Sequence, residues 1–215
     1  MTGRQMTRAI GDVHGKYAQY KKIIKGAARS IQVGDMGIGF KQFNHDGDLV
    51  WSTNPPHADM VKHNARMLRG NHDNPDVCKR NSQWIKDGTV ENDVMYIGGA
   101  TSIDKHHRIE GQSWWANEEC SYNDLQVMID TYMIVKPRVM ITHEAPESIA
   151  DAILSSLNRT KFDDPSRTRQ AFQVMLEAHR PEIWIFGHWH VDIDQVLNGT
   201  RFICLNELSW IDLEL

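Results

Sequence analysis

The stretch Ala9-Ile10-Gly11-Asp12-Val13-His14-Gly15 joins a short apolar run to a glycine-bounded turn that carries a carboxylate and an imidazole. The apolar residues before the first glycine are typical of the end of a buried strand. After the turn, the apolar side chains have the spacing of one helical face: Tyr20, Ile23, Ile24 and Ala27. The stretch therefore predicts a strand, a turn and a helix in succession, with Asp12 and His14 on the turn.

Four more apolar runs along the chain end in a short polar turn with metal-ligand residue types. These turns are Gly34-Asp35, Gly70-Asn71-His72-Asp73, Thr142-His143-Glu144 and Gly187-His188-Trp189-His190. In α/β sheets, ligands bind outside the carboxyl ends of the strands. We therefore expect these turns to converge in space although they are far apart in the sequence.

The residue types in these turns suit two divalent metal ions. Asp12 and His14 stand two residues apart, as do His188 and His190, so each pair can approach one ion from the same side. Asp35 is alone on its turn, and a carboxylate can bridge two cations at the roughly 3.5–4 Å separation of two-metal sites. Mixed imidazole, carboxylate and carboxamide donors favour manganese, iron or zinc over calcium or a thiolate-bound metal.

Composition limits the class of protein. The chain has 215 residues, 40% of them hydrophobic, which suits one domain over 1–215 with one core. The net charge of -4 leaves nucleic acid binding unsupported. The longest apolar runs are too short for a membrane span. The three cysteines are widely spaced, at Cys78, Cys120 and Cys204, and favour neither a disulfide framework nor a zinc ribbon. This is typical of a reducing compartment, so we expect a soluble, cytoplasmic protein.

Other segments give coarser predictions. A helix is expected after Asp163-Asp164, with Asp164 as its cap, and it should end before Pro181. Residues 36–59 predict an extended loop or insertion, and residues 98–119 are also irregular. Three strands are expected near the C-terminus, at 193–197, 201–205 and 208–213. Asn198-Gly199 between the first two is a hairpin signal.

Taken in order, the five turns resemble the signature of the calcineurin-like metallophosphoesterase family: G-D-x-H, G-D, G-N-H-D/E, a histidine, and G-H-x-H. The similarity runs from about Ile10 to His190 and is strongest to small bacterial and phage-borne members. It implies a four-layer α/β sandwich, in which helices flank two facing mixed sheets. It also implies a dinuclear metal site at the strand ends.

The resemblance implies a role for each matching residue. One metal ion would be bound by Asp12, His14 and His190, and the other by Asn71, His143 and His188. Asp35 would bridge them, and a metal-bound hydroxide would attack phosphorus. His72 would bind no metal; it would protonate the leaving oxygen or stabilise the transition state. Two divalent ions are expected as cofactors, manganese first, with iron, zinc or nickel as alternatives.

The chain departs from the protein-phosphatase branch after Gly34-Asp35, where that branch has a further aspartate and an arginine but this chain reads Met36-Gly37-Ile38-Gly39-Phe40. Arg69 is the candidate for the missing phosphate contact. Two interpretations of Asp73 stay open: it orients His72, or it caps the following turn. Two further pairs are given no role in catalysis. Glu118 and Glu119 are interpreted as a solvated pair, and Trp114 and Trp115 as core or loop anchors.

The hypothesis that follows is metal-dependent hydrolysis of a phosphate ester. A phosphodiesterase acting on a nucleotide or other small phosphodiester is favoured, because the protein-phosphatase aspartate and arginine are missing. The alternative is a phosphomonoesterase resembling protein Ser/Thr phosphatases, since the block 68–72 looks like that branch. A nuclease ranks third, and a non-catalytic scaffold fits poorly with an intact ligand set. The oligomeric state has no signal in the sequence.

Overall fold

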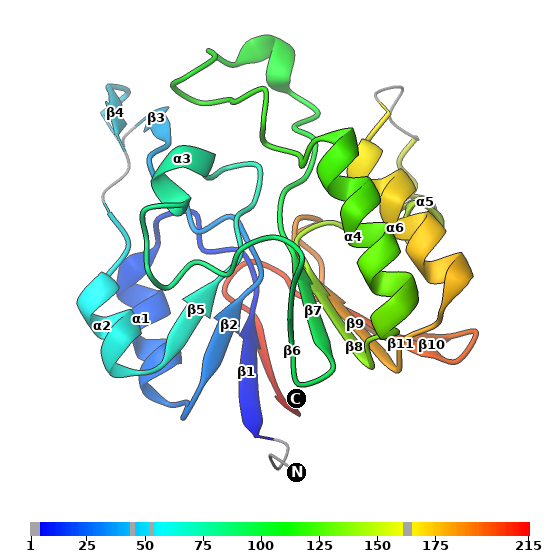
Figure 1. Cartoon of the computed structure of the whole chain (residues 1–215). Helices are drawn as coiled ribbons and strands as arrows, with labels where there is room; N and C mark the ends of the chain where they lie inside the picture. The colour runs from blue at the N-terminus through cyan, green and yellow to red at the C-terminus, as the bar shows by residue number, and fades with distance from the viewer. Residues whose placement is uncertain (1–4, 44–45, 52–53, 161–164) are drawn as a thin grey trace.

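A computed structural model describes residues 5–43, 46–51, 54–160 and 165–215. Four strands form a first sheet in the order β12-β1-β2-β5 (Figure 1). Their bounds are Trp210–Glu214, Met6–Ile10, Ser30–Gln32 and Ala65–Met67. β1, β2 and β5 are parallel, and β12 pairs antiparallel with β1. The register sets Ala9 opposite Ile31 on one side and Ile211 on the other.

Six strands form a second sheet in the order β10-β11-β9-β8-β7-β6. In chain order they are β6 (Thr89–Glu91), β7 (Val94–Ile97), β8 (Val139–Thr142), β9 (Ile183–Phe186), β10 (Ile193–Leu197) and β11 (Thr200–Cys204). The four inner strands are parallel, while both edge strands pair antiparallel. Met140 on β8 lies between Met95 and Trp184 on one face, and Ile141 lies between Tyr96 and Ile185 on the other. All six are buried, so the middle of this sheet is covered on both faces.

Apolar side chains join the layers into a sandwich. Ile31 on β2 and Leu68, directly after β5, pack with Ile141 and Ile185 of the second sheet in one buried cluster. Each such side chain contributes about 1.5–3 kcal/mol when it is fully buried.

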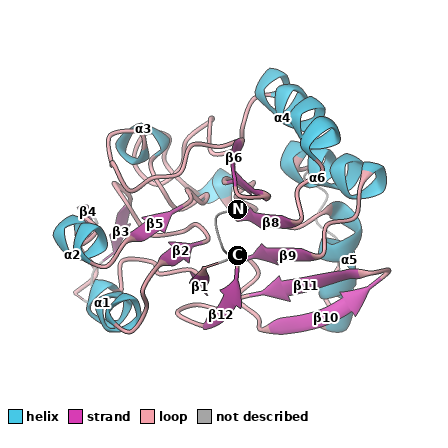
Figure 2. Cartoon of the chain, turned by 60° about the horizontal axis from the view of Figure 1, so that its bottom comes forward, coloured by secondary structure: helices cyan, strands magenta, loops and turns pink. Residues whose placement is uncertain are grey.

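The helices cover the outer faces of the two sheets (Figure 2). Helices α1 (Tyr17–Lys25) and α2 (His57–Lys62) contribute Tyr20, Ile24 and Met60 to a cluster on the first sheet. Helices α4 (Tyr122–Val135), α5 (Glu147–Ser156) and α6 (Arg167–Ala178) cover the second sheet. The predicted four-layer α/β sandwich is confirmed.

The structure corrects two sequence predictions of local structure. Helix α6 begins at Arg167, and its cap is Ser166, whose Oγ accepts the backbone N–H of Arg169 at 3.2 Å. The predicted cap Asp164 lies outside the described residues. Segment 36–59 also contains a two-stranded ribbon of β3 (Lys41–Phe43) and β4 (Leu49–Trp51). Segment 98–119 is irregular as expected, apart from the 3-10 helix η1 (Lys105–His107).

The C-terminal strands form as predicted, but they divide between the sheets. β10 and β11 form a hairpin whose turn residues Asn198 and Gly199 have φ values of 51° and 89°. β12 instead crosses to the first sheet, where Ile211 and Leu213 pack into the cluster between the sheets. Among the described residues, none of the helices is long and apolar enough to cross a membrane.

Candidate metal centre

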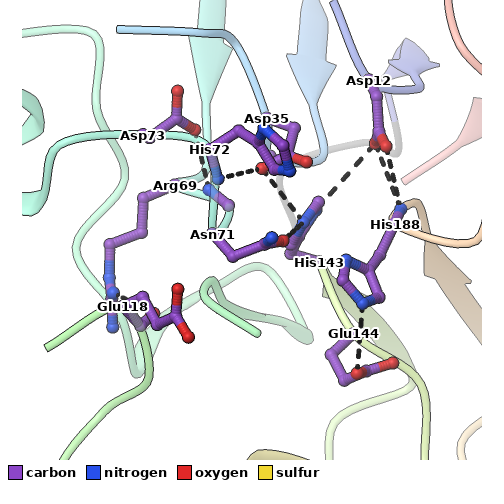
Figure 3. Close-up of polar contacts among 12 residues, drawn as sticks. Asp12, Asp35, Arg69, Asn71, His72, Asp73, Glu118, His143, Glu144 and His188 are labelled. Carbon is purple, nitrogen blue, oxygen red and sulfur yellow. Dashed lines mark hydrogen bonds and ion pairs between the residues drawn. The ribbon is translucent and has the colours of Figure 1, made fainter. Parts of the chain in front are cut away.

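The five polar turns follow the carboxyl ends of β1, β2, β5, β8 and β9, and the fold brings these ends together. Three of the strands belong to the first sheet and two to the second, so the turns face one another across the junction of the sheets. Figure 3 shows the side chains of Asp12, Asp35, Asn71, His143 and His188 directed toward one another from these turns. The predicted convergence is therefore present.

The first ligand group consists of Asp12, His14, Asp35 and His190, whose donor atoms all lie within 4.8 Å of one another. The Nε2 atoms of His14 and His190 are 3.1 Å apart. The His190 Nε2 atom is 3.0 Å from Asp12 Oδ2, and the His14 Nε2 atom is 3.7 Å from Asp35 Oδ2. Two imidazoles and two carboxylates thus surround one position.

The second ligand group consists of Asp35, His143 and His188, again with donor atoms within 4.8 Å of one another. His143 donates its Nδ1 proton to the carbonyl oxygen of Val33 at 3.0 Å, because a carbonyl can only accept. This hydrogen bond directs Nε2 into the site, 3.3 Å from Asp35 Oδ1 and 3.2 Å from Asn71 Oδ1. Asn71 therefore completes the second group.

Asp35 is the one residue that both groups contain. Its carboxylate is nearly inaccessible to solvent, since the residue is 1% exposed. One carboxylate oxygen faces His14, and the other accepts the backbone N–H of His72 at 2.7 Å. Asp35 therefore lies between the two ligand groups.

The donor set and the backbone both fit a pair of divalent ions. Four of these residues have positive φ values, namely His14 (46°), Asp35 (58°), His188 (66°) and His190 (51°). Such conformations cost about 1–3 kcal/mol each for non-glycine residues and cluster at functional sites. Buried carboxylates among imidazole nitrogens are the donors that manganese, iron and zinc accept.

A cleft of about 480 Å³ opens on this centre. Its floor includes Asp35, Asn71, His72 and His188. Its walls carry three arginines, Arg108, Arg159 and Arg169, and the apolar side chains of Ile103, Leu157, Trp189 and Val191. This volume is within the range of small-molecule sites, roughly 300–1,000 Å³.

The sequence profile of the calcineurin-like phosphoesterases matches residues 8–192, which include every predicted ligand. The chain belongs to the calcineurin-like phosphoesterase family. The resemblance seen in the sequence is thus confirmed, and as a member of this family the protein is a metal-dependent phosphoesterase. No curated protein matches the chain at a significant level.

Solved structures of this phosphoesterase fold are similar to the chain at low sequence identity. A putative 5'-nucleotidase from Staphylococcus aureus aligns with a TM-score of 0.57 and 15% identity over 95% of this chain and 49% of that chain. The phosphoesterase described here thus spans about half the length of that protein. Phosphopantetheinyl hydrolase from Mycobacterium tuberculosis aligns at 0.44 and 11% identity, over 96% and 91% of the two chains.

Two glycines of the phosphoesterase motifs are required by close approach of the aspartates. A Cβ atom on Gly70 would lie 2.0 Å from Asp35 Oδ1, and one on Gly187 would lie 2.3 Å from Asp12 Oδ1. Neither glycine has a positive φ. The glycines therefore leave space for the carboxylates rather than relieve backbone strain.

The electrostatics of the ligand groups keep the carboxylates charged. Burial alone would raise the pKa of Asp12, but contacts with His14 and His190 outweigh it and lower the pKa to about 2. Burial alone would lower the pKa of His14, and the carboxylates of Asp12 and Asp35 outweigh it and raise the pKa to about 9. Burial acts in the same direction on His143, where the charge of Asp35 raises the pKa to about 9.

Metal binding by this phosphoesterase is therefore expected to release protons. At pH 7 the metal-free protein holds protons on His14 and His143, because each has a pKa of about 9. A cation needs the neutral imidazole, so the apparent affinity for Mn²⁺ should rise with pH until about pH 9, by up to about tenfold per unit for each released proton. Titration calorimetry in buffers of different ionisation enthalpy measures the number released. Zero protons at pH 7 would contradict the assignment.

His72 lies beside the first ligand group without joining it. Its ring stacks on Phe40 with the centroids 4.9 Å apart, and it meets the His14 ring edge-on at 5.0 Å. Its Nε2 atom is 2.9 Å from Nη2 of Arg108. Burial, together with the charge of Arg108, outweighs Asp35 and lowers the pKa of His72 to about 4.

Asp73 has a different role from both interpretations of the sequence. Its carboxylate accepts backbone N–H groups of Gly37, Ile38 and Gly70 at 2.7, 2.9 and 2.7 Å. It thereby joins the turn after β2 to the turn after β5. The cap of the following helix α3 (Pro75–Cys78) is Asn74, whose side chain accepts two backbone N–H groups.

Arg69 also has a different place from the one predicted. Its guanidinium donates to Asp87 Oδ2 at 2.7 Å and to the carbonyl oxygen of Glu118 at 2.6 Å, and it contacts Cys120 Sγ at 3.0 Å. Figure 3 shows the side chain extended away from the ligands toward Glu118. These protein acceptors satisfy the guanidinium, so Arg69 is a structural residue rather than a phosphate contact.

Glu118 and Glu119 are buried, at 4% and 8% exposure, which corrects their interpretation as solvated. Glu119 accepts the Ser166 hydroxyl at 2.7 Å. Glu118 accepts both the backbone N–H and the hydroxyl of Ser102, at 2.7 and 2.6 Å. Ser102 Oγ in turn accepts Asn71 Nδ2 at 3.1 Å, which leaves Asn71 Oδ1 directed to the second group. The sequence did not reveal this series of hydrogen bonds, because Glu118 belongs to no recognisable motif.

Glu118→Gln is expected to weaken binding of the second metal ion about 10- to 100-fold, as is typical when a group that orients a ligand is lost. The physical reason is that the Ser102 hydroxyl loses its charged acceptor, so Asn71 is less firmly oriented. Mn²⁺ titration of Glu118→Gln measures the effect. Glu110→Gln, an exposed position of the same segment, is the matched control. Equal affinities of the two variants would refute the role.

Glu144 is a second buried group that sequence reasoning did not use. It is 1% exposed and accepts Trp189 Nε1 at 2.8 Å. Its Oε2 lies 3.6 Å from His188 Nε2 and 3.8 Å from Arg169 Nε. Glu144 is therefore the buried carboxylate next to the ring of His188.

Proposed function

We propose that this phosphoesterase hydrolyses a small phosphodiester, such as a nucleotide ester, at a dinuclear metal centre. The observation that carries the proposal is the pair of ligand groups that share Asp35 and open, beside His72, on a cleft of about 480 Å³. A cleft of this size suits a small ester better than a folded phosphoprotein.

In this proposal Asp12, His14 and His190 hold one ion, Asn71, His143 and His188 hold the other, and Asp35 bridges them. When bound, the ions, proposed to be manganese, would supply a water of lowered pKa and would neutralise charge on the phosphoryl oxygens. With the anionic substrate bound, Nε2 of His72 takes a proton from water and donates it to the leaving oxygen, which is the role of a general acid. The two buried aspartates remain ionised, since their pKa values are lowered.

The cleft walls support an anionic substrate with an organic substituent. Arg108, Arg159 and Arg169 supply positive charge, and guanidinium groups bind phosphate in a bidentate manner. Leu157 and Trp189 supply apolar surface for the substituent. A monoester needs less of this surface, so the lining favours the diester over the phosphomonoesterase alternative.

We also propose that the protein acts in the cytoplasm. Cys78, Cys120 and Cys204 are free and buried, which suits a reducing compartment. Detection of the protein in a periplasmic or secreted fraction would contradict this part of the proposal.

The test is manganese-dependent hydrolysis of thymidine 5'-p-nitrophenyl phosphate and bis-p-nitrophenyl phosphate, beside p-nitrophenyl phosphate, a nucleoside monophosphate and a phosphopeptide. A chelator and the Asp35→Asn protein serve as controls. Chelator-sensitive turnover that favours the diesters supports the proposal. A preference for the monoesters would overturn the diester assignment, and selective turnover of the phosphopeptide would favour the protein-phosphatase alternative.

A further inference from the structure

Segment 98–119 lies between β7 and α4 and arches over the carboxyl ends of the strands (Figure 1). It brings Arg108 into the cleft wall, where the guanidinium contacts the ring of His72. We infer that Arg108 binds the phosphoryl group of the substrate and that it does so by exchanging His72 for a phosphate oxygen. This inference rests on the proposed function, because it concerns the same cleft.

Arg108 is held so that one end of its guanidinium faces the centre. Nε pairs with Asp104 Oδ1 at 2.7 Å, and Nη1 donates to the carbonyl oxygen of Ser113 at 3.2 Å. Nη2 points to His72, 2.9 Å from Nε2. The side chain of Arg108 is only 11% exposed, so its position is set by these contacts.

Phe40 keeps the guanidinium and the imidazole together. The Phe40 ring stacks on His72 with an interplanar angle of 21°, and the Arg108 Cζ atom lies 5.4 Å from the centre of the same ring. Trp115 packs against Phe40 at 5.8 Å. One aromatic ring therefore aligns both polar groups at the edge of the metal centre.

In the contact between Arg108 and His72, a phosphate oxygen can replace His72 as the hydrogen-bond acceptor. A guanidinium only donates, so Nε2 of His72 must accept the hydrogen bond and its lone pair is occupied. A phosphate oxygen is a stronger acceptor than a neutral imidazole nitrogen, because its negative charge adds Coulomb attraction to the guanidinium. A bound phosphate ester therefore takes the Nη2 donor and leaves the Nε2 lone pair of His72 unoccupied.

Two other arginines are committed to protein partners. Arg69 is satisfied by Asp87 and by backbone carbonyls, so it is not available for this role. Arg169 lines the cleft but is paired with the buried Glu144. Arg108 is the arginine in contact with His72, next to the shared Asp35.

The experiment measures binding of inorganic phosphate to the manganese-loaded full chain by calorimetry, for the native protein and for Arg108→Ala, Arg108→Lys and Arg201→Ala. Arg201 forms a comparable pair with Asp194 on the surface, with contacts of 2.7 and 2.6 Å, and serves as the control. Loss of hydrogen bonds between charged groups should weaken phosphate binding about 10- to 100-fold in Arg108→Ala. Arg108→Lys should retain part of the affinity, and manganese content should stay unchanged in all variants.

Measurement of kcat and KM distinguishes a failure of the inference from a failure of the proposed function. A rise in KM together with a fall in kcat for both Arg108 variants supports the inference. Unchanged phosphate affinity with a lower kcat would overturn it, because Arg108 would then only position His72, while the proposed function would stand. Phosphate binding that depends on Arg108 in a protein without turnover supports the inference and rejects the proposed function. Absence of phosphate binding by the native protein would overturn the inference.

Discussion

Asp35→Asn is expected to lower the occupancy of both metal ions and to reduce turnover about 10³-fold or more. Asp35 is the residue common to both ligand groups, and its two oxygens face different histidines. A carboxamide offers one oxygen and no charge, so it cannot bridge two cations. The expected loss corresponds to roughly 4 kcal/mol of transition-state stabilisation, a reasonable share of what metal ions provide.

Elemental analysis after gel filtration measures the metal content of Asp35→Asn, and thermal unfolding checks that it folds. Asp130→Asn is a suitable control, because that carboxylate is exposed on α4. Two full equivalents of metal in Asp35→Asn would refute the bridging role. Loss of only one ion would assign Asp35 to a single ligand group.

His72→Ala is expected to reduce turnover about 10²- to 10⁴-fold while metal content stays at the native level. The magnitude is that of a general acid. The ring of His72 lies beside His14 and contacts Arg108, and the ligand groups form without it. The variant should therefore separate metal binding from proton transfer.

The measurement for His72→Ala compares substrates with good and poor leaving groups. An ester of p-nitrophenol needs little protonation, so its turnover should fall less than that of an alkyl ester. His63→Ala, which follows α2 and is remote from the ligand groups, is the control. Equal loss on both kinds of ester would show that His72 stabilises charge rather than donates a proton.

Much of the metal centre was predictable from the sequence because its information is local. Each ligand lies on a short turn directly after an apolar run, as at Asp12 and His143, and parallel strands bring such turns to one edge of the sheet. The order of the five turns predicted the family, and the profile match over residues 8–192 confirms it. The assignment of individual ligands stays a prediction that Asp35→Asn tests in part.

Other features depend on contacts between residues far apart in the chain. Glu118 is an acidic residue in an irregular segment, and only its burial against Ser102 distinguishes it from a solvated one. Arg69 follows an apolar run within a motif, yet its guanidinium pairs with Asp87 instead of entering the cleft. Asp73 binds backbone N–H groups of a turn that lies more than thirty positions earlier in the chain.

The sequence by itself determined the α/β class, the strand-end turns and the residue types of the two ligand groups. The reason is that the periodicity of apolar residues, the positions of glycines and the chemistry of ligand side chains are properties of short segments. Only the tertiary structure decided that β12 joins the first sheet, that Glu118 orients Asn71 and that Arg108 faces His72. These outcomes depend on which groups become buried together. A buried charge must find a partner, and that partner is selected by packing rather than by its position in the chain.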